Sequence, residues 1–120
     1  MTKAQYEQKL GPLLNDVIDP SLRATVGTGA GAADPQKVSA AITSVQLAHD
    51  QMAAVTPPPQ VADLNQQAVA LMGSMIRDMT KLRDAETRSD RNEALAAATA
   101  LKREALRLEN LGSQFSSRGY

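Results

Sequence analysis

The chain has 120 residues, enough for one domain, and 13 Lys and Arg balance 13 Asp and Glu, so its formal net charge is zero. This balance does not favour nucleic acid or anionic lipid as a partner, and three aromatic residues are too few for base-stacking platforms. Cysteine is absent, which excludes disulfides, thiolate metal sites and cysteine nucleophiles. No run of roughly 18 apolar residues occurs, so no transmembrane segment is predicted. We expect a single domain over residues 1–120.

The first predicted helix spans about residues 2–26. Apolar residues recur at helical spacing along it, namely Tyr6, Leu10, Leu13, Leu14, Val17 and Ile18. Gly11-Pro12 is expected to kink or restart this helix, because proline removes a backbone donor and crowds the preceding turn. Asp19-Pro20 is a second expected break. The glycine-rich residues 27–31 predict a loop, and they lack the Lys-Ser or Lys-Thr that a phosphate-binding loop requires.

A second helix is predicted over residues 35–55, because Asp34-Pro35 fits an N-cap followed by proline at the first helical position. Its apolar stripe contains Val38, Ile42, Val45, His49 and Met52, widened by Ala41, Ala48 and Val55. The run Thr56-Pro57-Pro58-Pro59 follows. A polyproline ligand is one interpretation of it. Both flanks are helical and no basic residue is near, so we interpret it as the corner of a helical hairpin.

The third and fourth helices are predicted over residues 58–88 and 90–117. The stripe of the third contains Val61, Leu64, Ala68, Leu71, Met75, Met79 and Leu82. The stripe of the fourth contains Ala94, Leu95, Ala98, Leu101, Ala105, Leu108, Leu111 and Phe115. Asp90 and Glu93 resemble a capping box, and Asp84 and Arg88 are spaced for an i,i+4 ion pair.

No segment alternates apolar and polar residues for long enough to be a strand. The predicted fold class is therefore all-α, and four amphipathic helices with short connections favour an antiparallel up-down four-helix bundle. The alternative is a three-helix bundle with a kinked first helix, which would then lie across a hairpin.

His49 is the one histidine of the chain, and its place on the stripe of the second helix makes it the first candidate ligand. Across the predicted hairpin it could join Met52, Met72, Met75 and Met79. Imidazole and thioether groups suit Cu(I), and a His–Met pair can ligate haem. Methionine is more often a gap filler in cores. We expect these five residues to belong to the core, and we predict no metal, no haem and no other cofactor.

The acidic residues give no indication of catalysis. Asp50, Asp63 and Asp78 are predicted to lie on the polar sides of their helices, so no paired acids for acid–base chemistry are expected. A single histidine without a Gly-x-Ser-x-Gly motif gives no support to a hydrolase triad. The sequence therefore predicts no catalytic residues and a protein that is not an enzyme.

Three short motifs carry a resemblance to a known group of proteins. Tyr6, Leu10, Pro12 and Leu13 match a Tyr-x-x-x-Leu-x-Pro-Leu opening. Residues 55–64 match a central Leu/Val-Thr-Pro-Pro-x-x-Val-Ala-x-Leu element, and the chain closes on Gly119-Tyr120. Together they resemble the Ala- and Leu-rich helical domains of secreted proteins and lipoproteins of actinobacteria and related bacteria, mostly of unknown function. This resemblance supplies no catalytic residues, and this chain has no lipid-accepting Cys.

The resemblance implies an extracytoplasmic place for the protein, secreted or lipid-anchored at the cell surface. We therefore predict a non-enzymatic helical bundle that acts as a binding or structural module, as a monomer or weak oligomer. Its partner would be an unidentified protein or small molecule rather than nucleic acid. A small-ligand, metal or haem sensor and an intracellular helical adaptor are the alternatives.

Overall fold

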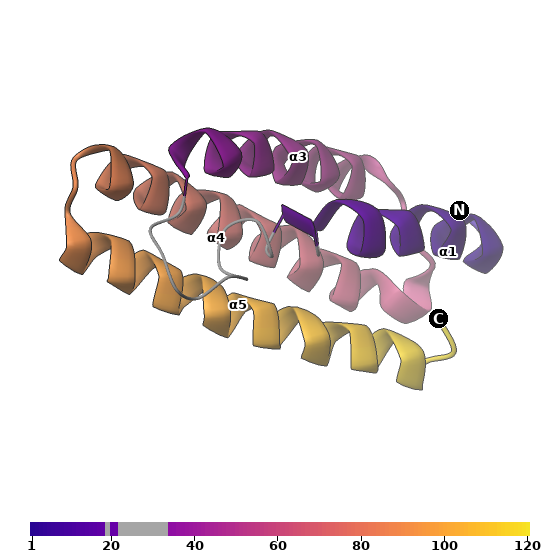
Figure 1. Ribbon diagram of the computed structural model, residues 1–120. Helices are drawn as coiled ribbons and strands as arrows, with labels where there is room; N and C mark the ends of the chain where they lie inside the picture. The colour runs from indigo at the N-terminus through magenta and orange to yellow at the C-terminus, as the bar shows by residue number, and fades with distance from the viewer. Residues whose placement is uncertain (19, 22–33) are drawn as a thin grey trace.

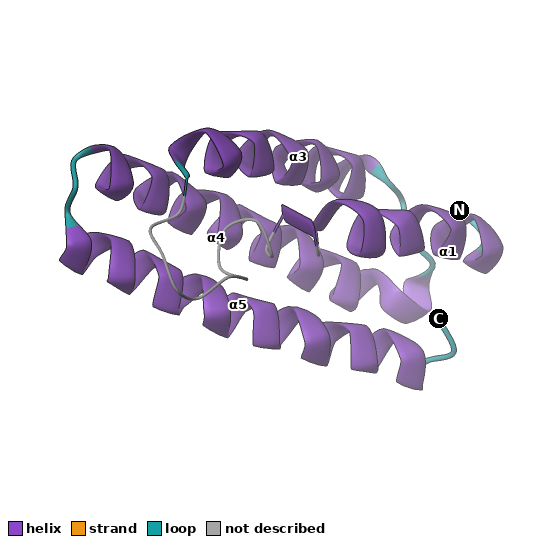
Figure 2. Cartoon of the chain, in the orientation of Figure 1, coloured by secondary structure: helices purple, strands orange, loops and turns teal. Residues whose placement is uncertain are grey.

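The computed structural model describes residues 1–18, 20–21 and 34–120, without the side chains of residues 15–17. Within these residues the long elements are the α-helices α1 (Lys3–Pro12), α3 (Pro35–Ala54), α4 (Ala62–Thr87) and α5 (Arg91–Ser117). Figure 2 shows helices and loops and no strand in this part of the chain, so the predicted all-α class is confirmed. The predicted helix end near residue 26, the loop at 27–31 and Asp19 lie outside the described residues.

Helix α1 begins where a capping box satisfies its first backbone groups. The backbone N–H of Gln5 donates to the Thr2 hydroxyl at 3.2 Å, and the Thr2 N–H donates to Gln5 Oε1 at 2.9 Å. At Pro12 the α-helix gives way to a π-helical segment, Leu13–Ile18, which packs against α3. Pro12 has no N–H for the preceding turn, so the hydrogen-bond ladder changes there. The break predicted at Gly11-Pro12 is therefore a change of helix type.

Helix α3 begins and ends as its sequence indicates. The Asp34 side chain accepts a hydrogen bond from the Gln36 N–H at 2.9 Å, and Pro35 occupies the first turn. The helix ends at Ala54, Val55 has extended backbone, and the short 3₁₀ turn Pro59–Val61 leads into α4. The triple proline is thus the corner of the α3–α4 hairpin, as predicted.

A second tight turn joins α4 to α5. Ser89 has a left-handed backbone (φ 57°), and the N–H groups of Asp90 and Ser89 donate to the carbonyls of Ala85 (2.8 Å) and Glu86 (3.2 Å). This pair of hydrogen bonds is a Schellman motif, in which glycine usually occupies the left-handed position. Asp90 then caps α5 by accepting from the Glu93 N–H at 3.1 Å. The four helices run alternately up and down (Figure 1), and the predicted antiparallel bundle is confirmed.

Helix α4 is the centre of the bundle, because it packs against α3 along one side and α5 along the other. The short α1 runs along the bundle near the end that holds both termini (Figure 1), rather than across the hairpin as the three-helix alternative would require, and a hydrogen bond from Tyr6 to Asn65 joins it to α4. The bundle measures 47 × 22 × 19 Å along its principal axes. Within the described residues, no helix combines the length and hydropathy needed to cross a membrane.

The core differs from the predicted stripes on α3 and α5. On α3, Ile42, His49 and Val55 are only partly buried. Every predicted stripe residue of the third helix is buried, and Met72 joins them. On α5, however, Leu95 is 69% exposed, and Ala98 and Ala105 are only partly buried. The buried seam is Ala94, Ala97, Leu101, Glu104, Leu108, Leu111 and Phe115, which alternates steps of three and four residues. The predicted stripe contained five of these seven residues and omitted Ala97 and Glu104.

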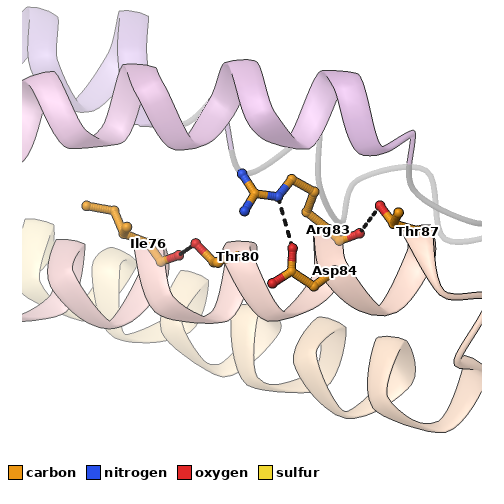
Figure 3. Close-up of polar contacts among 5 residues, drawn as sticks. All are labelled: Ile76, Thr80, Arg83, Asp84 and Thr87. Atoms are coloured by element: carbon orange, nitrogen blue, oxygen red, sulfur yellow. Dashed lines mark hydrogen bonds and ion pairs between the residues drawn. The ribbon is translucent and has the colours of Figure 1, made fainter.

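The predicted ion pair between Asp84 and Arg88 does not form. Asp84 instead accepts a hydrogen bond from Arg83 Nε at 3.2 Å (Figure 3). Arg88 contacts Glu93 across the turn. Two threonines of the same helix, Thr80 and Thr87, donate their hydroxyls to backbone carbonyls one turn earlier, each at 2.8 Å. These contacts lie within α4 or join its end to the first turn of α5, so they shape a solvated surface rather than a site.

Candidate functional site

The five candidate ligands do not share one environment. Met52, Met72, Met75 and Met79 are each at most 1% exposed and belong to the hydrophobic core. His49 lies at the edge of the α3 stripe, where 28% of its side chain is exposed. Within the described residues, no group of three or more His, Cys, Asp or Glu side chains could hold a metal ion.

The imidazole of His49 has a polar partner on its own helix. Its Nδ1 lies 3.0 Å from Asp50 Oδ1, which also accepts a hydrogen bond from Gln46 Nε2 at 3.0 Å. These hydrogen bonds, first from His49 and then from Gln46, hold the pKa of Asp50 below its usual value. The expectation that His49 is a core residue is therefore corrected: the ring is only partly buried and faces Asp50 at the surface.

A buried polar cluster joins three helices at the end of the bundle that holds the termini. The Tyr6 hydroxyl of α1 donates to Asn65 Oδ1 of α4 at 2.9 Å, and Asn65 Nδ2 donates to the Met52 carbonyl of α3 at 3.2 Å. The Met52 carbonyl is in the last turn of α3, where carbonyls lack intrahelical partners. Asn65 therefore caps α3 from a neighbouring helix.

The three aromatic residues of the chain meet at the same end. The Tyr6 ring lies 6.0 Å from that of Phe115 and 5.9 Å from that of Tyr120, the latter edge-on, and Lys3 Nζ lies 5.4 Å from the Tyr120 ring. Burial, and secondarily the Tyr120 charge, raises the pKa of Tyr6 to about 12. A ring held this tightly, with its hydroxyl already bonded, stabilises the fold rather than offering a reactive group.

A second Schellman motif folds the chain end onto this aromatic cluster. Gly119 has φ +85°, and the N–H groups of Tyr120 and Gly119 donate to the carbonyls of Phe115 (2.9 Å) and Ser116 (3.0 Å).

Arg118, the residue before this glycine, ties the end of α5 to the start of α4. It donates to both carboxylate oxygens of Asp63 (2.6 and 3.0 Å) and to the Gln60 carbonyl (2.8 Å). The hydrogen bond and charge of Arg118 hold the pKa of Asp63 below its usual value.

These contacts bring together the three motifs on which the family resemblance rests. The opening motif contributes Tyr6, the proline corner lies between Met52 and Asn65, and the closing motif contributes Gly119 and Tyr120. These motifs lie far apart in the sequence, and the contacts around them hold one end of the bundle together. Their shared role is therefore to fix how α1, α3, α4 and the end of α5 meet, which is a structural role.

One acidic residue occupies a core position. Glu104 is 5% exposed in the α5 seam between Leu101 and Leu108, and its Oε2 has no hydrogen-bond partner among the described residues. Burial, followed by the hydrogen bond and charge of Asp78 on α4, raises the pKa of Glu104 to about 8 against the opposing influence of Arg107 and Arg77. The expectation that no acids pair is therefore corrected, since Asp78 acts on Glu104 through a hydrogen bond and its charge.

An open groove with a volume of about 300 Å³ lies between α4 and α5. We call it the α4–α5 groove, and its lining residues are Gln67, Ala70, Leu71, Ser74, Arg107, Asn110, Leu111 and Gln114. Its floor is apolar where Leu71 and Leu111 are buried, and its polar groups are a guanidinium, three amides and a hydroxyl. Such a surface can bind a ligand by hydrogen bonds and a charge but offers no paired acid and base.

Sequence reasoning missed Asn65, Glu104 and the groove for different reasons. Asn65 follows the stripe residue Leu64, and only the fold shows that the Met52 carbonyl faces it. Glu104 could have been found from its spacing, because it lies three residues after Leu101 and four residues before Leu108, as a buried position of this helix should. The groove depends on how two helix faces meet, which no periodicity in one helix reveals.

The scan against protein-family models, the search of curated proteins and the search of solved structures each find no match to this chain. The resemblance to actinobacterial secreted helical domains therefore stays a prediction.

Proposed function

We propose that this chain is a non-catalytic helical bundle that acts as a binding module, and that it binds through the α4–α5 groove. The observation that carries this proposal is the lining of the groove, in which an apolar floor is surrounded by a few polar side chains. This combination is typical of ligand sites, where apolar contact supplies affinity and polar groups fix orientation.

The occupant we propose is a short protein segment that carries a carboxylate. The Arg107 side chain is exposed and has no salt-bridge partner among the described residues, and a guanidinium binds a carboxylate through two parallel hydrogen bonds. The amides of Asn110 and Gln114 both donate and accept, as a peptide backbone requires.

The length of the groove fits such a segment. From Gln67 to Ser74 the lining covers seven helical steps, or about 10 Å at roughly 1.5 Å per residue. Three extended residues span about the same distance at roughly 3.3 Å each. A contact of this size supports weak, specific binding rather than a permanent complex.

Selection of binders from a random heptapeptide library by the whole chain tests this function. We expect the selected peptides to be enriched in Asp and Glu, and their affinity to fall at least tenfold for Arg107→Ala. Lys102→Ala, an exposed cation of the same helix outside the groove, is the matched control and should bind like the wild type. Peptides without acidic enrichment, or equal binding by Arg107→Ala, would overturn the proposal.

The compartment is proposed from the resemblance alone. We place the protein outside the cytoplasm, secreted or lipid-anchored, and the alternative is an intracellular adaptor that uses the same groove. Protease treatment of intact cells of the native host distinguishes them, because only an extracytoplasmic copy is digested. A metal or haem sensor stays an alternative prediction, but the surface position of His49 does not favour it.

A further inference from the structure

We propose that Asp78 and Glu104 form a proton-dependent latch between α4 and α5, which holds the two helices together while the pair shares a proton and loosens them when that proton is lost. The inference goes beyond the proposed groove, because it concerns the hairpin that carries the groove. Glu104 occupies a core position of α5, and the buried residues one turn before and one turn after it are hydrophobic.

The surroundings of Glu104 suit a neutral carboxyl group and not a carboxylate. A protonated Glu104 can donate its O–H to the Asp78 carboxylate, which is a strong, charge-assisted hydrogen bond. An ionised Glu104 would instead place two negative charges side by side, and its Oε2 has no donor among the described residues. Loss of the proton therefore converts an attraction between the helices into a repulsion.

The other charged groups set the strength of the latch. Among the described residues, Arg77 of α4 and Arg107 of α5 favour the ionised form of Glu104, whereas Asp78 opposes it, and no charged group of α1 or α3 acts on it. Burial and Asp78 outweigh the two arginines, and the pKa of Glu104 stands at about 8. The latch is thus closed at neutral pH and opens above pH 8.

The absence of cysteine from the chain allows a direct test with spin labels. Lys81→Cys and Lys102→Cys place labels on exposed positions of α4 and α5 close to the pair in sequence. We expect the distance between the labels, measured by electron paramagnetic resonance, to lengthen or broaden between pH 7 and pH 9. The same labels with Glu104→Gln should show no change, because the amide stays neutral.

A carbon NMR titration of the Glu104 carboxyl in the whole unlabelled chain completes the test. We expect a midpoint near pH 8, which Asp78→Asn should lower because it removes the like charge. Glu109→Gln, an exposed change on the same helix, should leave both measurements as in the wild type. A Glu104 midpoint in the ordinary carboxyl range, or labels that move alike with and without Glu104→Gln, would overturn the latch.

Discussion

The Tyr6 hydroxyl donates a hydrogen bond to Asn65 Oδ1 at 2.9 Å, across 59 positions of sequence and within the buried end of the bundle. Asn65 in turn caps the last turn of α3 through the Met52 carbonyl. One side chain of α4 therefore fixes both α1 and α3, and it closes the corner made by three prolines from within the α3–α4 hairpin.

Replacement of Asn65 by Leu is expected to destabilise the fold. The change leaves the Tyr6 hydroxyl and the Met52 carbonyl buried without partners, which costs about 1–3 kcal/mol of unfolding free energy. Urea denaturation at pH 7 measures this loss. Gln66→Leu, at the exposed neighbouring position, is the control and should stay within about 0.5 kcal/mol of the wild type. An Asn65→Leu protein as stable as that control would refute the capping role.

Tyr6→Phe tests the other half of the same hydrogen bond. The ring and its contacts with Phe115 and Tyr120 remain, so we expect a loss of about 0.5–1.5 kcal/mol. Combined with Asn65→Leu, the two changes should cost less than the sum of their separate effects, because both remove one interaction. Strict additivity in this double-mutant cycle would show that the two side chains are not coupled.

The high pKa of Tyr6 predicts a loss of stability at alkaline pH. The folded state holds the Tyr6 proton up to about pH 12, whereas an unfolded tyrosine loses it near pH 10. The contribution of Tyr6 is therefore complete below pH 10 and declines as pH rises through 10 to 12. Ultraviolet titration of tyrosinate should show a component near pH 12 that is absent from Tyr6→Phe. A Tyr6 titration near pH 10 would contradict the buried, bonded hydroxyl.

The two Schellman turns predict opposite effects of alanine and glycine. Gly119→Ala forces a Cβ into φ +85° and should lower stability by about 1 kcal/mol, although the added carbon would meet nothing closer than Lys3 Nζ at 3.5 Å. Ser89→Gly relieves a left-handed serine at φ 57° and should raise stability by about 0.5–1 kcal/mol. Thermal unfolding of both variants gives the signs, and two changes of the same sign would count against this explanation.

The pKa of Glu104 gives the bundle a preference for acidic over alkaline pH. Its folded pKa of about 8 lies above the ordinary 4.5, so the folded state binds the extra proton between these values. Stability should therefore fall as pH rises from about 4.5 to about 8 and then level off with respect to this group. Glu104→Gln should remove this decline and be more stable than the wild type at pH 8, as measured by melting temperature. An equal decline in both proteins would show that another group causes it.

The helices and their order could be predicted because the signals are local. Asp34-Pro35 and Asp90 mark helix starts, and the triple proline marks a corner, so the observed bounds of α3 and α5 lie within one residue of those predicted. The contacts between helices could not be predicted in the same way. Leu95 looked like core because it is apolar, yet it is 69% exposed, while Glu104 is buried because the seam passes through its position.

The functional groups that the structure brings together differ from those that the sequence favoured. His49 and the four methionines share a periodicity, but a periodicity does not decide which side of a stripe faces solvent. Asp78 and Glu104 lie 26 positions apart on helices that run in opposite directions, so their pairing depends on the register between α4 and α5. Register follows from the whole bundle and from the length of the turn, which single-helix patterns do not contain.

The location of a bound acidic peptide on the protein tests the central claim, binding through the α4–α5 groove, most directly. Backbone amide signals of the ¹⁵N-labelled chain would be followed while a selected Glu-containing heptapeptide is added. We predict that the signals that move belong to residues 67–74 and 107–114, and that Arg107→Ala abolishes these shifts. Shifts confined to other surfaces, or shifts that persist in Arg107→Ala, would contradict it.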